Sequence, residues 1–186
     1  MEKKDLDWGN IGFSYMPTDK RYVANYKDGA WDEGGMTSDP NVVINECAGI
    51  LQYCQEIFEG LKAYTTEDGS IVTFRPDLNA ERMMDSARRL EMPPFPKERF
   101  LEAVDQVVKA NAAWVPPFGS GATLYLRPYM FATGPVIGVK PSQEYQFRLF
   151  GTPVGPYFKG GAKPLTLCVS DFDRAAPNGT GHVKAG

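Results

Sequence analysis

Short runs of alternating apolar and polar residues occur in the first part of the chain, a pattern typical of antiparallel strands with one buried face. One such run extends from Tyr22 to Trp31 and is interrupted by Asp28-Gly29, a residue pair that favours a tight hairpin turn. The polar, glycine-rich residues 32–41 follow. The pattern therefore predicts a hairpin over residues 22–31 and then a loop.

A second hairpin is predicted between residues 51 and 74. The second half of the apolar and aromatic run 51–64 leads through a turn at Asp68-Gly69 into the apolar run 71–74. Gly60 interrupts the first of these runs. A glycine within a strand pattern marks a bulge or a close approach of another group to the backbone, and we expect one of the two here.

The hydrophobic period then changes from two residues to about 3.6, which indicates helices. The first helix is predicted to begin at Arg75-Pro76-Asp77 and to end at the proline-rich segment 92–96. A second helix is predicted from Lys97 to about Trp114, before Pro116-Pro117. Their apolar stripes consist of Leu78, Met83, Ala87 and Leu90 in the first helix and of Phe100, Leu101, Val104, Val107, Val108 and Ala112 in the second.

Strands are expected again in the last third of the chain. The predicted strands are 123–131, 146–152 and 165–170, and glycine-rich loops occupy 134–139 and 154–161. Hairpins followed by two helices and further strands predict an α+β two-layer domain, an antiparallel sheet with helices on one face.

Composition and charge exclude several classes of partner. The 186 residues are 42% hydrophobic and 23% charged, which suffices for one domain with a proper core, with or without a fragment of another. The net charge of −3, with no run of like charges, argues against a nucleic-acid partner. No apolar run approaches the roughly 20 residues that cross a bilayer, and the N-terminus lacks the apolar core of a signal peptide. We therefore expect no membrane partner.

The three cysteines, Cys47, Cys54 and Cys168, form no Cys-x-x-Cys pair. Their odd number and spacing argue against a structural zinc site and against a disulfide framework. We interpret them as free thiols in a reducing cytoplasm.

The familiar catalytic motifs are missing from the sequence. The segment 179–184 superficially resembles a phosphate loop, but Val183 and Ala185 flank Lys184 where such a loop needs glycine and a hydroxyl residue. His182 is the only histidine, so a metal site built from histidines is excluded. No Gly-x-Ser-x-Gly motif occurs.

Tyr125 and Arg127 indicate a site for an acid group. They lie two residues apart in an apolar strand, so both side chains point to the same face, where a phenol and a guanidinium could bind one carboxylate. The alternative is that Arg127 lies on a polar outer face of the sheet. Tyr53, Phe58 and Tyr157 are either core aromatics, as most aromatic residues are, or walls of a ligand site, at which the glycines near Phe58 and Tyr157 hint.

Five segments, in this order and spacing, resemble those of the branched-chain amino-acid aminotransferases, class IV enzymes that use pyridoxal 5′-phosphate. They are Phe58–Tyr64, Phe74–Met83, Leu124–Pro128, Pro153–Phe158 and the tail through Lys184–Gly186. The resemblance covers most of the chain. It implies the N-terminal domain of the class IV fold and a transaminase that moves the amino group of Leu, Ile or Val to 2-oxoglutarate, giving glutamate.

The resemblance also implies roles for individual residues. Lys184 matches the lysine that forms the Schiff base with the cofactor and returns the substrate α-proton, tasks that suit an amine. Arg82 matches the arginine that holds the cofactor phosphate. Tyr125 and Arg127 match residues near the substrate carboxylates, with Arg127 expected to pair with the second carboxylate of glutamate. Residues matching the side-chain pocket are Phe58, Tyr157, Tyr53 and Val139, the last on a loop that the family contributes across a homodimer interface.

Members of this family are about 300 residues or more long, which corresponds to two domains. We therefore expect residues 1–170 to form the N-terminal domain, residues 171–186 to form an interdomain segment, and a second domain to be absent from this sequence. That second domain would supply the acidic partner of the pyridine nitrogen and further phosphate ligands. In the chain alone we expect Lys184 to be disordered or exposed, without cofactor and without activity.

Two alternatives stay open. The chain could be a non-catalytic domain that keeps the ancestral dimer surface. It could also derive from a class IV enzyme that acts on D-amino acids or on an aminodeoxychorismate. The segments Arg75-Pro76-Asp77-Leu78-Asn79 and Tyr125-Leu126-Arg127-Pro128 favour the branched-chain group.

Overall fold

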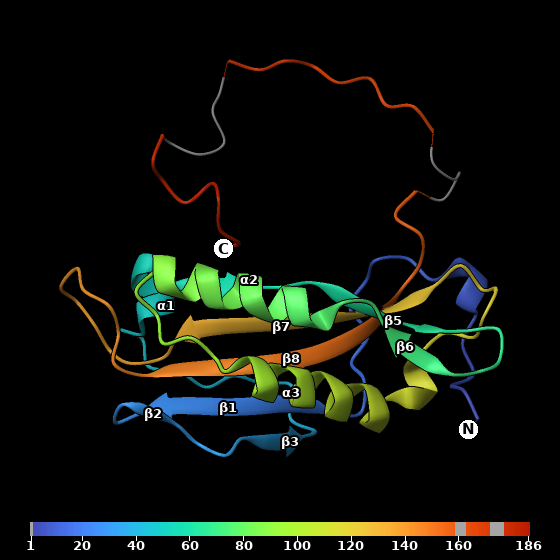
Figure 1. Ribbon diagram of the computed structural model, residues 1–186, viewed down its shortest axis with the longest axis horizontal. Coiled ribbons are helices and arrows are strands. Elements are labelled where there is room, and N and C mark those ends of the chain that lie inside the picture. Colours follow the sequence, from blue (N-terminus) through green and yellow to red (C-terminus); the bar gives the residue numbers. More distant parts are fainter. Residues whose placement is uncertain (1, 159–162, 172–176) are drawn as a thin grey trace.

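The computed structural model describes residues 2–158, 163–171 and 177–186. Two long strands, β7 and β8, form the centre of an antiparallel sheet with the order β2-β1-β8-β7-β5-β6, in which β3 also pairs with β1 and β4 with β7. The helices α2 and α3 lie together on one face of this sheet (Figure 1). The strands are β1 (Arg21–Lys27), β2 (Ala30–Trp31), β3 (Gly35–Thr37), β4 (Glu56–Phe58), β5 (Leu61–Thr65), β6 (Ile71–Thr73), β7 (Thr123–Ala132) and β8 (Tyr145–Val154). The helices are α1 (Gly49–Tyr53), α2 (Pro76–Arg89) and α3 (Lys97–Ala110), with short 3-10 turns at Trp8–Asn10 and Ala112–Trp114.

The core lies between the sheet and the two helices. Leu126 of β7 and Phe147 of β8 are fully buried, as are Ala87 of α2 and Val107 of α3. The ring of Phe95, which follows α2, stacks on Phe147 at 3.9 Å between centroids. The predicted α+β two-layer domain is therefore confirmed, and so are its two hairpins, its two helices and the strands in 123–131 and 146–152.

The assignment of Leu78 to the apolar stripe of the first helix is wrong. Leu78 is 49% exposed, whereas Met83 and Ala87 of the same helix are buried. Leu78 lies five residues before Met83, which at about 100° per residue places it about 140° away around the helix. It therefore falls outside the face that packs on the sheet.

Two short elements also differ from the predictions. The predicted loop 32–41 contains β3, whose residues pair with β1 through Tyr22 opposite Met36. The stretch before Cys54, for which no element is predicted, forms α1. A short apolar run fits either structure by its pattern alone, so the tertiary environment decides.

The predicted strand 165–170 is wrong. These residues form no regular structure, and Leu165, Leu167 and Val169 are exposed. Their alternation resembles that of a strand, but no described strand lies beside them to accept and donate backbone hydrogen bonds. The predicted segment 171–186 and the loop 154–161 lie partly outside the described residues. Within the described chain, no helix has the length and apolar character needed to cross a bilayer.

Candidate functional site

Gly60 lies where β4 passes into β5. Phe58 pairs with Tyr129 and Leu61 with Leu126, so both strands run along β7 in one register and no bulged residue separates them. A Cβ atom on Gly60 would lie 2.6 Å from the hydroxyl oxygen of Tyr125. Of the two predicted roles of Gly60, the close approach of a neighbour is therefore the correct one.

Glu59, the residue before Gly60, holds Arg82 in place. Its carboxylate is fully buried and accepts hydrogen bonds from Arg82 Nε at 2.6 Å and Arg82 Nη2 at 2.7 Å. Asn79 Nδ2 donates to the same carboxylate at 2.8 Å, and the Gly60 amide at 3.3 Å. The hydrogen bonds to Glu59 raise the pKa of Arg82, which therefore stays charged.

Sequence reasoning missed Glu59, although a signal was present. Ile57 and Glu59 lie two residues apart in a strand pattern, so both point to the same face. Ile57 is apolar and fully buried. A glutamate on that face needs a buried partner, and Arg82 on the following helix supplies it.

The structure gives Lys184 a defined position, so the expectation that it is disordered or exposed is wrong. Its backbone amide donates to Ser86 Oγ at 3.0 Å, and its carbonyl accepts from the Phe58 amide at 3.2 Å. Ala185 forms a bridge with Ile57. The backbone groups at the outer edge of β4 need hydrogen-bond partners, and residues 184–185 provide them. This pairing holds Lys184 beside α2, where it is half-buried.

Two cations lie close to the ring of Phe58. Lys184 Nζ is 4.3 Å from the centroid of its ring, and Arg127 Cζ is 4.7 Å from the same centroid. Arg127 Nε donates to the hydroxyl oxygen of Tyr125 at 2.9 Å. The prediction that Tyr125 and Arg127 share one face is therefore confirmed, and each cation gains from the ring.

A hollow of about 600 Å³, here called the Lys184 hollow, collects part of the predicted site. Phe58, Arg82 and Lys184 line it together with their neighbours in 180–186. Arg82 uses Nε and Nη2 for Glu59, and its third nitrogen, Nη1, has no hydrogen-bond partner among the described residues. The hollow thus has an amine and an available guanidinium N–H, the groups that an anionic carbonyl compound needs.

Three predicted pocket residues do not line this hollow. Tyr53 is 42% exposed and its hydroxyl donates to the Ile137 carbonyl. Val139 is 91% exposed. Tyr157 is 77% exposed and packs edge-on against Phe13, with ring centroids 5.5 Å apart.

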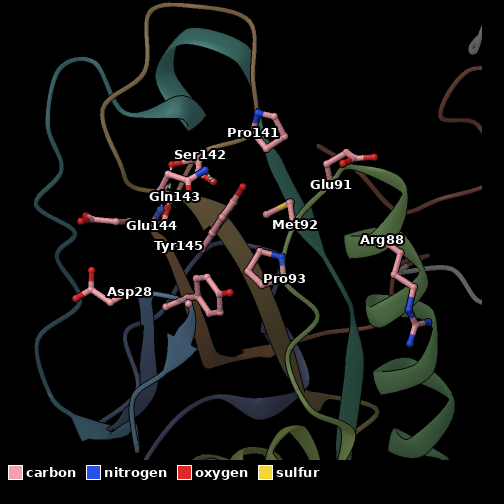
Figure 2. Close-up of a pocket in the computed structure, with 12 residues that line it drawn as sticks. Asp28, Arg88, Glu91, Met92, Pro93, Pro141, Ser142, Gln143, Glu144 and Tyr145 are labelled. Atoms are coloured by element: carbon pink, nitrogen blue, oxygen red, sulfur yellow. Dashed lines mark hydrogen bonds between the residues drawn. The ribbon is translucent and has the colours of Figure 1, made fainter.

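A second hollow, of about 710 Å³, contains none of the predicted site residues. Figure 2 shows it between the β1–β2 turn, the residues after α2 and the segment leading into β8. Its acidic side chains include Asp28, Glu91 and Glu144, the last of which pairs with Lys27 at 3.1 Å. In the part of the chain that the structure describes, no cluster of His, Cys, Asp and Glu is suited to a metal ion.

Comparison with known proteins gives one consistent result. No family model matches the chain. It is 56% identical over 183 residues to a branched-chain-amino-acid aminotransferase of Haemophilus influenzae, covering 98% of this chain and 53% of that protein. A branched-chain-amino-acid aminotransferase of Helicobacter pylori is 48% identical over 185 residues, covering 98% of this chain and 54% of that protein.

Solved structures agree with the sequence comparison. A branched-chain amino acid aminotransferase of Escherichia coli superposes with a TM-score of 0.64 at 25% identity, covering 87% of this chain and 49% of that one. A branched-chain aminotransferase of Thermoproteus uzoniensis has the same fold, with a TM-score of 0.60 at 23% identity over 76% of this chain and 43% of that one. The chain spans about half the length of the curated relatives it matches. By sequence and by fold, this chain is therefore a relative of the branched-chain-amino-acid aminotransferases along nearly its whole length.

Proposed function

We propose that the chain is the N-terminal portion of a pyridoxal phosphate-dependent aminotransferase that moves the amino group of Leu, Ile or Val to 2-oxoglutarate. The observation that carries the proposal is the meeting of Lys184, Arg82 and Phe58 in the Lys184 hollow. The similarity to branched-chain-amino-acid aminotransferases supports it. The proposal includes the division into a domain over 1–170, an interdomain segment over 171–186 and a second domain, together with a cytoplasmic homodimer.

The residues of the Lys184 hollow fit the cofactor. Arg82 has Nη1 available for the phosphate, and its bidentate pairing with the buried Glu59 fixes the direction in which the guanidinium points. The Lys184 amine is the covalent attachment point in this proposal. When bound, pyridoxal phosphate acts as the electron sink for negative charge at the substrate α-carbon.

Lys184 moves the proton. Once free, its amine would take the proton from the substrate α-carbon and hold it for return, which is general base and general acid catalysis by one group. Two anchors of its backbone, on Ser86 and on Phe58, restrict where the amine can reach. Such positioning lowers the entropic cost of proton transfer.

Substrate choice depends on the residues that contact the substrate side chain. The Phe58 ring is an apolar wall for a branched side chain, and Tyr53, Val139 and Tyr157 are proposed to complete that wall. Arg127, oriented by Tyr125, pairs with the second carboxylate of 2-oxoglutarate and glutamate. The exposed Val139 is proposed to reach the pocket of the second subunit of the homodimer.

Covalent trapping tests this proposal. The full-length protein is incubated with pyridoxal phosphate, reduced with borohydride and mapped by mass spectrometry. We expect the adduct on Lys184, its loss in Lys184→Ala, and its retention in Lys109→Ala, which removes an exposed lysine of α3 paired with Asp105. An adduct that survives in Lys184→Ala contradicts the assignment.

A substrate panel then separates the alternatives. We expect the full-length protein to transfer the amino group of leucine, isoleucine and valine to 2-oxoglutarate. Turnover of D-alanine or of aminodeoxychorismate with leucine inert would favour the other class IV enzymes. A trapped adduct without any turnover would favour the non-catalytic domain.

A further inference from the structure

Two arginines are buried on the face of the sheet opposite α2 and α3. Arg21 of β1 is 3% exposed and Arg148 of β8 is 7% exposed. Their neighbours Tyr22 and Phe147 belong to the core between sheet and helices, so by alternation the two arginines point to the other face. Val23 is the partner of Arg148, and Arg21 is therefore its diagonal neighbour, about 7–8 Å away between backbones and within reach of long side chains.

The hydrogen-bond acceptors of both guanidinium groups are neutral. Arg21 donates to the carbonyls of Thr18, at 3.0 Å, and of Ser38. Arg148 donates to the carbonyl of Asp39 and to Gln146 Oε1, both at 3.1 Å. Among the described residues, no carboxylate lies within ion-pair distance of either arginine.

One carboxylate lies near both cations without pairing with either. The pKa of Asp39 is lowered chiefly by hydrogen bonds from Asn41, and the charges of Arg148 and Arg21 lower it further. Asp39 Oδ1 is already occupied by the backbone amide of Asn41 at 2.9 Å and by its side-chain amide at 2.8 Å. A carboxylate that forms an ion pair with neither arginine leaves two buried guanidinium groups with an uncompensated positive charge, which is costly away from water.

A hollow of about 460 Å³, here called the arginine hollow, is lined by both arginines. Its walls are aromatic: Tyr15 and Tyr129 each meet the ring of Phe150 edge-on, at 5.8 Å and 6.0 Å between centroids. Burial raises the pKa of Tyr129, so the phenol stays neutral and adds no negative charge. The hollow therefore combines a cationic floor with apolar walls.

We infer that the arginine hollow binds a small organic carboxylate whose apolar body is aromatic or branched. The planar guanidinium groups of Arg21 and Arg148 match a carboxylate through paired N–H groups. The rings of Tyr15 and Phe150 cover the apolar body. The volume suits a small molecule, since ligand sites measure about 300–1,000 Å³. The site stands independently of the aminotransferase proposal, because none of its residues has a role there.

Calorimetric titration of the full-length protein with phenylacetate tests this site. We expect saturable binding, weakened about tenfold or more in Arg148→Gln, which keeps a donor for the Asp39 carbonyl but removes the charge. Arg88→Gln, which removes an exposed arginine paired with Asp85, should bind as the wild type does. Arg127→Gln separates the two sites, since Arg127 belongs to the substrate site of the proposed enzyme and does not line the arginine hollow. Binding lost in Arg127→Gln and kept in Arg148→Gln overturns the inference.

Two further probes separate the sources of the signal. 2-Phenylethanol has the same ring without the charge and should not saturate. Inorganic phosphate should bind more weakly than phenylacetate, because it cannot use the aromatic walls; equal or tighter phosphate binding overturns the assignment to an organic carboxylate. If Arg148→Gln does not fold, Tyr15→Ala serves instead, since Tyr15 is 55% exposed. Unchanged phenylacetate binding in a folded Tyr15→Ala protein overturns the inference.

Discussion

The Glu59 carboxylate accepts two hydrogen bonds from the Arg82 guanidinium, at 2.6 and 2.7 Å, and the two side chains differ in burial. The Glu59 side chain is fully buried, whereas 56% of the Arg82 side chain is exposed. Loss of either residue breaks the same pair but leaves different remnants. An arginine left behind can be hydrated, while a carboxylate left behind stays in the interior.

Arg82→Ala should therefore destabilise the protein more than Glu59→Gln. We expect the free energy of unfolding to fall by about 2–4 kcal/mol for Arg82→Ala, because Glu59 then keeps only Asn79 and Gly60 as donors. For Glu59→Gln we expect a loss of about 1–2 kcal/mol. Urea unfolding measures both, and the double variant should cost less than the sum of the two. The opposite order would show that the carboxylate is not the group that needs its partner.

Gly60→Ala should displace Tyr125. The added Cβ would lie 2.6 Å from the Tyr125 hydroxyl oxygen and 3.1 Å from its Cε2 atom, so the ring must move. We expect a loss of about 1–3 kcal/mol in the free energy of unfolding. A crystal structure of the variant should show the hydrogen bond from Arg127 to Tyr125 broken. Gly138→Ala is the matched control, because a Cβ there meets nothing within 4 Å, and an equal effect of the two variants would contradict the steric explanation.

Stability should fall in acid through Asp77. Hydrogen bonds from Arg75 at the start of α2 lower the pKa of the Asp77 carboxyl from 3.8 to about 2. A carboxyl with a depressed pKa in the folded state contributes stability that is complete above its unfolded pKa and disappears as the pH falls through its folded pKa. The loss is expected between about pH 4 and pH 2. Carboxyl carbon shifts in NMR follow the titration, and Arg75→Gln should move the Asp77 midpoint back towards its ordinary value. A wild-type midpoint near that ordinary value rules the pairing out.

Cys54→Gly should stabilise the protein. Cys54 ends α1 in the left-handed region, with φ 51° and ψ 34°, a conformation that side chains disfavour and glycine adopts freely. Relief of about 1–2 kcal/mol of strain, less the larger entropy of an unfolded glycine, leaves a gain of about 0.5–1 kcal/mol. Thermal unfolding measures it. Cys168→Gly is the control at another exposed cysteine without a positive φ, and it should not raise the Tm.

The sequence pattern predicts those features that depend on neighbouring residues alone. Asp28-Gly29 sets its hairpin by turn geometry, and the shared face of Tyr125 and Arg127 follows from the two-residue period alone. The run 165–170 shows the limit, because its alternation is that of a strand and yet it forms no strand in the structure. A strand forms only when a second segment hydrogen-bonds with it, and the pattern of one segment does not show whether such a second segment lies beside it.

Most of the candidate site depends on contacts between distant segments and could not be predicted from local pattern. Arg82 and Lys184 are 102 positions apart in the sequence, and only the packing of the tail against β4 and α2 brings them to one hollow. Resemblance to a family supplied their roles; periodicity did not. The ion pair of Glu59 with Arg82 and the burial of Arg148 are likewise tertiary facts, since the sequence does not show which segments pack against these side chains.

The seating of Ala185 beside Ile57 has a consequence for self-association. β4 pairs with β7 along one side, so its other side is a short open edge of the sheet. Open edges offer unpaired N–H and C=O groups to strands of other molecules and so promote aggregation. Residues 184–186 cover this edge through the Phe58 amide and the Ile57 bridge. The segment that carries the candidate catalytic lysine therefore also keeps the sheet from pairing with a neighbour.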